Sequence, residues 1–216
     1  MTIPHLVSVN VGLPKQIGLR RGRPVMSAID KRPVPGSHRV EGVNVTGDEQ
    51  ADLRVHGGPD KAVYAYAAED TAWWNGELGR DDLGPGMFGE NLTTEGVDCT
   101  NAVIGEQWRI GTTLLEVCQP RQPCFKLGLH FEDPKMLKRF AQASRPGAYL
   151  RIIEPGDIQA GDAIEIVDVP AHGVTIRLVS DAILLDHGLA ADAARAPELP
   201  GPLRDWLLER AADPNP

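Results

Sequence analysis

Residues 112–128 read TTLLEVCQPRQPCFKLG, and the other motifs of the chain are best interpreted around this stretch. Residues 112–118 are mostly apolar or β-branched, which is typical of a β-strand. Proline fixes φ and cannot donate to a strand ladder, so the strand should end near Pro120. Cys124 would then lie in a stiff loop between Arg121 and Lys126.

Two interpretations of Cys124 are open at this point. A free cysteine often packs as a small, half-buried hydrophobic residue. Alternatively, the cations Arg121 and Lys126 would stabilise a thiolate, which is the form that acts as a nucleophile or as a soft-metal ligand. Of the other cysteines, Cys118 is expected to be structural, and Cys99 has no neighbour that suggests chemistry.

The composition predicts a β-rich globular protein. The 216 residues are 42% hydrophobic and 24% charged, and the 18 prolines and 23 glycines favour short elements joined by turns. The length suits one large domain, or one domain with a small appendage. Three widely spaced cysteines without a CxxC motif predict neither a disulfide framework nor a structural zinc site, and they indicate a reducing cytoplasm.

Charge and hydropathy argue against two kinds of partner. A formal net charge of −8 disfavours nucleic-acid binding. No apolar run approaches the roughly 20 residues of a membrane helix, and no signal-peptide pattern is visible, so we expect a cytoplasmic protein with no membrane partner. Residues 1–40 nevertheless contain seven Lys or Arg and a single acid, Asp30. This basic segment is either a local anion site or a solvated surface.

Periodicity predicts strands over most of the first 168 residues. The expected strands cover residues 5–13, 25–31, 40–45, 62–66, 112–118, 147–153 and 161–167. Residues 102–111 are expected to form a turn, a strand and a tight hairpin into the strand before Cys124. Turns are expected at residues 18–23 and 47–50, and a glycine-punctuated loop at residues 84–96. Helices are expected at residues 67–79, ended by Gly79, and at residues 133–141, with Asp133 as N-cap.

The pattern changes near His172. Residues 174–188 and 202–211 can each form a helix, and glycine ends the first of them. We therefore expect a β domain over residues 1–168 and a short helical appendage over residues 172–216. The appendage would serve in packing, in formation of a homodimer or in docking of a partner.

Two further loops carry clustered polar groups. In residues 55–62 (VHGGPDKA), the pair Gly57 and Gly58 permits close backbone approach to a ligand, while His56 and Lys61 offer a donor or ligand and a cation. In residues 84–96 (GPGMFGENLTTEG), the polar side chains are those of Glu90, Asn91, Thr93 and Thr94. These groups could bind a heteroaromatic or phosphorylated ligand, or they could serve only in turns and caps.

Three runs, residues 55–62, 88–96 and 119–127, together resemble the signature of the MOSC domain family, named after the C-terminal domain of molybdenum cofactor sulfurases. Their order and spacing, with the element at residues 47–50, resemble the stand-alone bacterial, YiiM-like type. The resemblance covers most of residues 5–167. It implies a MOSC-type β-barrel followed by a short, three-helix-like appendage.

The resemblance also implies a cofactor and a reaction. The cofactor is the molybdenum cofactor (Mo-molybdopterin), with Cys124 as the metal ligand, and pyridoxal phosphate is not required. The reaction is reduction of small N-hydroxylated compounds, such as hydroxylaminopurines, to amines in base detoxification. His56 is the first candidate for the proton donor. The expected cofactor-binding residues are Lys31, Arg32, His56, Gly57, Gly58, Lys61, Glu90, Asn91, Thr93, Arg121 and Lys126.

Electrons would come from a separate reductase, because the chain has no flavin fingerprint, iron–sulfur spacing or haem motif. Two other functions remain open. One is a non-catalytic carrier of the molybdenum cofactor or of sulfur, for which Cys124 would also serve. The other is a metal-free transferase or hydrolase in which His56 or His130 is the base for Cys124.

Overall fold

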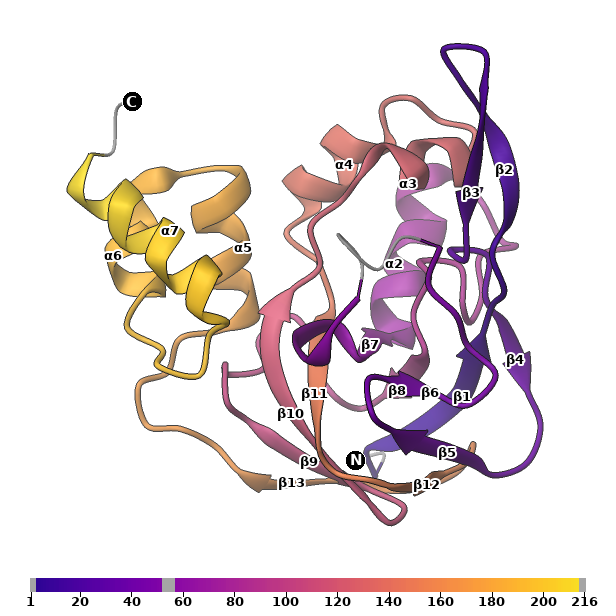
Figure 1. Cartoon of the computed structure of the whole chain (residues 1–216), viewed down its shortest axis with the longest axis horizontal. Coiled ribbons are helices and arrows are strands. Elements are labelled where there is room, and N and C mark those ends of the chain that lie inside the picture. Colours follow the sequence, from indigo (N-terminus) through magenta and orange to yellow (C-terminus); the bar gives the residue numbers. More distant parts are fainter. Residues whose placement is uncertain (1–2, 52–56, 214–216) are drawn as a thin grey trace.

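The computed structural model describes residues 3–51 and 57–213, and its strands form one large sheet and two small ones (Figure 1). The strands are β1 (His5–Val11), β2 (Lys15–Arg20), β3 (Arg23–Ser27), β4 (Arg32–Val34), β5 (His38–Glu41), β6 (Asn44–Val45), β7 (Val63–Ala67), β8 (Leu92–Glu95), β9 (Gln107–Ile110), β10 (Thr113–Pro120), β11 (Ala148–Glu154), β12 (Gly156–Ile158) and β13 (Ile164–Asp168). The helices are α2 (Ala68–Leu78), α3 (Phe125–His130), α4 (Met136–Ala143), α5 (Ile176–Leu184), α6 (Ala190–Ala193) and α7 (Gly201–Ala212), with 3-10 helices η1 (Pro59–Lys61) and η2 (His187–Leu189). The predicted fold class, mainly β with some α, is confirmed.

The large sheet has eight strands in the order β13-β9-β10-β11-β7-β8-β1-β4. Its neighbouring strands are antiparallel except for the parallel pair β7 and β8. Leu6 donates its backbone N–H to Asp162 at 2.9 Å, and Gly161 donates to Leu6 at 2.7 Å. The sheet thus curls until the start of β1 meets the chain entering β13. Within the described residues the strand ladders do not close a ring, so the expected barrel is a strongly curled open sheet.

Strand β10 is the long strand that leads to the candidate site. All its residues except Glu116 are buried, which fits its continuous apolar character between β9 and β11. It ends at Pro120, as predicted. Helix α2 also matches its prediction, because Gly79 caps it in the left-handed region with φ 61°.

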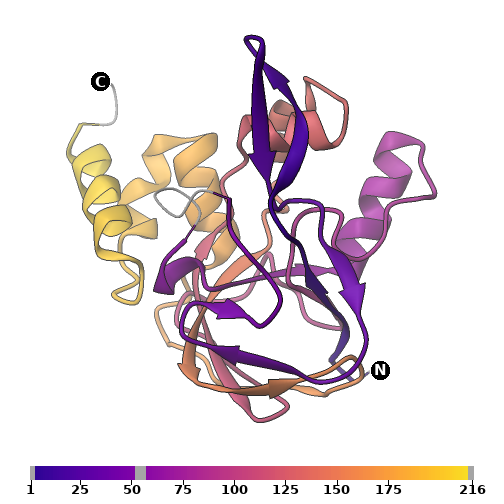
Figure 2. The same cartoon turned by 45° about the vertical axis from the view of Figure 1, so that its right-hand side comes forward.

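The prediction of a turn over residues 18–23 is wrong in extent, because the turn in the structure is shorter. Strands β2 and β3 pair antiparallel with Arg20 opposite Arg23, leaving a two-residue turn at Arg21 and Gly22. Both turn residues have positive φ, 52° and 74°, as the twist of a tight hairpin requires. Figure 2 shows this hairpin projecting from the body of the protein.

Other boundaries also differ from the sequence prediction: the strand expected at residues 25–31 is β3 over residues 23–27, and the one expected at residues 40–45 is the pair β5 and β6. The loop expected at residues 84–96 contains β8, whose partners β1 and β7 are distant in sequence. Cys124 was expected within a loop, but helix α3 begins at the next residue, Phe125. Helix α4 begins at Met136, whereas the Asp133 carboxylate accepts the Lys135 N–H at 2.8 Å in the preceding turn.

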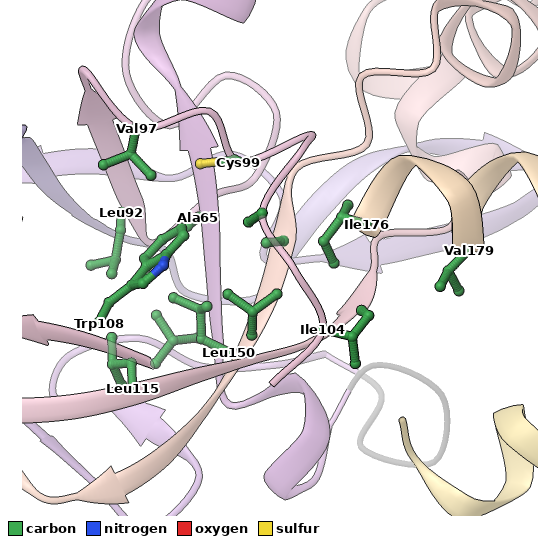
Figure 3. Packing of buried hydrophobic residues seen from close by; sticks show 14 of the residues in the cluster. Ala65, Leu92, Val97, Cys99, Ile104, Trp108, Leu115, Leu150, Ile176 and Val179 are labelled. Atoms are coloured by element: carbon green, nitrogen blue, oxygen red, sulfur yellow. The ribbon is translucent and has the colours of Figure 1, made fainter. Parts of the chain in front are cut away.

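The main hydrophobic core is shared by the sheet and the C-terminal helices. Trp108 and Leu150 of the sheet belong to the same buried cluster as Ile176 and Val179 of α5 (Figure 3). The cluster extends to Leu207 of α7. Burial of these side chains against the sheet therefore holds the helices in place. Among the described residues, no helix has both the length and the apolar character needed to span a bilayer.

A second, largely aromatic cluster lies beside the candidate site. The Phe88 ring stacks on Tyr66 with centroids 4.6 Å apart and packs against Phe131 at 5.1 Å. The Trp74 indole donates to the Tyr66 hydroxyl at 2.9 Å, which satisfies its polar atom inside the cluster. Because Phe88 belongs to the loop between α2 and β8, its packing in this cluster holds that loop in place.

Candidate functional site

A pocket of about 100 Å³, partly open to solvent, lies where several chain segments meet. The described part of its wall comes from the end of β3 and the residues after it, the residues after β6, the end of η1, β7, the loop before β8, the segment from β10 into α3, and β11. All three motif runs contribute to it. The pocket therefore brings together segments that are far apart in the sequence.

Cys124 lines this pocket and is half-buried. It is the residue immediately before α3, and its carbonyl accepts the Leu127 N–H at 2.9 Å. By contrast, Cys118 and Cys99 are buried, and burial raises the pKa of the Cys99 thiol to about 12. Cys118 donates its thiol to the Asp60 carbonyl at 3.0 Å. The cysteine chosen from the sequence is thus the one with access to the pocket.

Among the described residues, four cations line the pocket: Lys31, Lys61, Arg121 and Lys126. They come from four different segments, so the fold gathers positive charge that is dispersed in the sequence. Arg32, also expected at the site, lies outside the lining. It is exposed and pairs with Asp30 at 2.9 Å.

Arg121 is the cation with an unmet hydrogen-bonding requirement. Only 7% of the residue is exposed, and its buried Nη1 atom has no hydrogen-bond partner among the residues that the structure describes. The guanidinium lies over the rings of Tyr64 at 5.6 Å and Phe140 at 5.2 Å. Aromatic faces stabilise the charge but leave the N–H group unsatisfied. An anionic oxygen in the pocket would complete this site.

Lys31 and Asn91 are held by one buried carboxylate, Asp48. Asp48 forms an ion pair with Lys31 and accepts the Asn91 side-chain N–H at 2.9 Å. It also accepts the Gly12 backbone N–H at 2.8 Å. Burial lowers the pKa of Lys31, while the charge of Asp48 opposes that shift. The charge of Lys31 is therefore already balanced by the Asp48 carboxylate. Asp48 also holds the surrounding pocket wall in place.

Glu90 and Thr93 lie behind the pocket and do not line it. The fully buried Glu90 carboxylate accepts the N–H groups of Gly86 at 2.6 Å and Phe88 at 3.0 Å, and the Thr93 hydroxyl at 2.9 Å. Burial raises the pKa of Glu90 to about 7. Thr93 in turn accepts the Asn10 amide at 2.9 Å. Both residues shape the loop before β8.

The glycine loop reaches the pocket through Lys61. Gly58 has φ 96° and precedes η1, whose Lys61 N–H bonds to the Gly58 carbonyl at 3.0 Å. Gly57 and Gly58 are described but do not line the pocket. The Asp60 carbonyl accepts the Gln119 amide at 2.8 Å, which ties this turn to β10. His56 lies outside the described residues.

His130 does not line the pocket. Its Nε2 atom is buried without a partner, and burial lowers its pKa. In the described part of the chain, no hydrogen bond joins His130 to Cys124. The structure therefore gives no support to a Cys124–His130 nucleophile and base.

Sequence reasoning missed several lining residues, including Asp48 and two tyrosines. Tyr64 and Tyr149 face each other on β7 and β11, with ring centroids 5.1 Å apart. Their segments were predicted as strands, but nothing in the pattern marks them as pocket residues. Asp48 had a usable signal, because it lies in the 47–50 element that contributed to the family resemblance.

These features define a β-rich domain with a cation-lined pocket and one accessible cysteine. The MOSC domain model matches residues 52–165. The protein YflK of Bacillus subtilis is 35% identical over 175 residues, which cover 81% of this chain and 78% of YflK. The chain belongs to the MOSC domain family.

Two further comparisons bear on the type of MOSC protein. The crystal structure of YiiM from Geobacillus stearothermophilus superposes with a TM-score of 0.77 at 29% identity, covering 96% of this chain and 99% of YiiM. The chain is YiiM-like. A protein of Gibberella moniliformis named Reductase is 36% identical over 168 residues, covering 76% of this chain but 29% of that longer protein.

Proposed function

We propose that this protein binds the molybdenum cofactor in the pocket and reduces small N-hydroxylated compounds to amines. The observation that carries the proposal is the presence of Cys124 in one pocket with Arg121, whose buried Nη1 has no partner in residues 3–51 and 57–213. A thiolate suits a soft metal, and an unpaired guanidinium N–H suits a phosphate oxygen. The donor set therefore fits a phosphorylated metal cofactor.

The residues divide by chemistry. Cys124 would ligate molybdenum through sulfur, and Arg121, Lys61 and Lys126 would bind the phosphate end of the cofactor. The Tyr64 and Tyr149 rings provide apolar surface for a flat heterocycle. When bound, the cofactor supplies two-electron redox chemistry that the side chains lack.

The chain itself would orient the substrate and move protons. The overall change is R–NHOH + 2 e⁻ + 2 H⁺ → R–NH₂ + H₂O, in which the N–O bond breaks and the nitrogen is reduced. The ion pair of Lys31 and Asp48 keeps this wall of the pocket rigid. Less entropy is therefore lost when a ligand binds. His56 is proposed as the proton donor because imidazole titrates near neutral pH.

The direct test is Cys124→Ser, in protein loaded with cofactor and assayed with dithionite-reduced methyl viologen as electron donor. We expect reductase activity to be abolished, because a serine hydroxyl is a poor soft-metal ligand. Molybdenum and pterin content are measured on the same samples, and circular dichroism verifies folding. Full activity in this variant would contradict ligation by Cys124. Wild-type protein that holds the cofactor without turnover would indicate the carrier function.

A second test addresses the phosphate site. Arg121→Ala should weaken cofactor binding by about 10- to 100-fold, since a charge-assisted hydrogen bond contributes about 1.5–3 kcal/mol. Arg177→Ala is the matched control, because Arg177 also has a buried unpartnered nitrogen but lies on α5 outside the pocket. Pterin retained after gel filtration is the measurement. Equal losses in the two variants would exclude a specific role for Arg121.

A further inference from the structure

The β2–β3 hairpin is a basic, projecting element whose charge contrasts with that of the whole chain. Arg20, Arg21 and Arg23 lie at its tip and are exposed. The ion pairs of the described residues involve none of these three arginines. The net charge of the chain is −8, so this local excess of positive charge is not a general property of the surface.

The outer face of the same hairpin is apolar. Leu19 is 59% exposed and pairs with Pro24, while Met26 is 47% exposed on the same face. The opposite face packs on α3, where Gly18 lies next to Leu129. Arg20 and Arg23 alternate with Leu19 and Pro24 and therefore belong to the other face of the hairpin, so the apolar outer face ends at a basic tip. Exposed apolar and arginine side chains in one element are usual in protein-docking surfaces.

The hairpin is connected to the candidate site at two points. The Arg20 guanidinium lies 4.0 Å from the centre of the Phe125 ring, and Phe125 follows Cys124 in the chain. At its other end, β3 continues directly into Ala28 and Ile29, which line the pocket. A protein docked on the hairpin would therefore be held close to Cys124. Short separation matters because the rate of electron tunnelling falls steeply with distance.

We propose that the β2–β3 hairpin is the docking surface for a small acidic electron-transfer protein, an inference that rests on the proposed function. Such a donor delivers one electron per encounter, so two reduced donor molecules are oxidised for each hydroxylamine reduced to amine and water. Opposite charges steer this kind of association, and the complexes are small and transient.

The test uses a plant-type [2Fe–2S] ferredoxin kept reduced by NADPH and its reductase. In Arg21→Glu/Arg23→Glu, we expect the KM for ferredoxin to rise at least about tenfold at low ionic strength. Turnover with reduced methyl viologen should not change. The control, Arg39→Glu/Arg195→Glu, makes the same charge change at exposed sites in β5 and after α6, and it should retain the wild-type KM for ferredoxin. Because these two arginines pair with nearby acids, circular dichroism verifies that the control is folded.

Isothermal titration of oxidised ferredoxin into each variant tests docking independently of turnover. We expect the Kd of wild type to rise with salt and the Kd of the hairpin variant to be higher and less salt-dependent. Leu19→Ser, which leaves the charge intact, should raise the Kd about threefold by removing apolar contact. Equal affinities in the hairpin and control variants would overturn the proposed surface. If wild type binds ferredoxin but shows no turnover with either reduced ferredoxin or reduced methyl viologen, the proposed function is overturned instead.

Discussion

At the scale of single residues, Glu90 makes the stability of the protein depend on pH. Its pKa is raised from 4.5 to about 7 by burial, so between these values the native state binds more protons than the unfolded state. The free energy of unfolding should therefore fall as pH rises through this window, by up to about 3 kcal/mol above pH 7. Urea unfolding at pH 4.5 to 8 measures this slope.

Other buried groups also titrate, so the Glu90 contribution is isolated by difference. Burial raises the pKa of Asp70, which contributes in the same direction as Glu90, and lowers the pKa of His130, which contributes in the opposite direction. Glu90→Gln should flatten the curve between pH 4.5 and 7 relative to wild type, whereas the exposed control Glu41→Gln should not. Parallel curves for wild type and Glu90→Gln would show that Glu90 does not titrate in this range.

Individual site residues were predictable only where side-chain chemistry is visible in the sequence. Cys124 stood out because prolines and cations surround it, and it does line the pocket. Tyr64 could not be found, because alternation identifies a strand without saying which residue faces a cavity. Glu90 was expected to bind the cofactor, but it lies behind the pocket and accepts hydrogen bonds from two backbone N–H groups and the Thr93 hydroxyl, which no sequence pattern displays.

At the scale of elements, the loop before β8 depends on the backbone conformation of one glycine. Gly86 has φ 84°, and a Cβ atom there would lie 2.5 Å from the Lys31 carbonyl oxygen. We expect Gly86→Ala to destabilise the protein by about 1–3 kcal/mol and to displace the Lys31 wall of the pocket. Gly84→Ala is the control in the same loop, since nothing lies within 4 Å of its Cβ position. Comparable losses of Tm in both variants would contradict this steric explanation.

Elements were predictable from the sequence where local signals are strong. Proline ended β10 and glycine ended α2, because both act through their own backbone. The β2–β3 hairpin was mistaken for a longer turn, since Arg21 and Gly22 lack the Asn-Gly signature of such hairpins. Strand β8 was missed because its ladders join segments distant in the chain. Local patterns carry no information about such pairing.

At the scale of the whole molecule, residues 172–216 raise the question of whether the C-terminal helices unfold with the sheet. Leu207 of α7 is fully buried in the core cluster that also contains Leu115 and Val117 of β10. A continuous apolar core couples its parts into one cooperative unit. We therefore expect a single unfolding transition. Leu207→Ala should lower the free energy of unfolding of the whole protein by about 2–5 kcal/mol. The neighbouring Leu208→Ala is the control. Leu208 is 45% exposed, so its truncation should lower the free energy of unfolding far less. Calorimetry could instead resolve two transitions, with Leu207→Ala shifting only the one at lower temperature. That result would establish that the helices fold as a unit of their own.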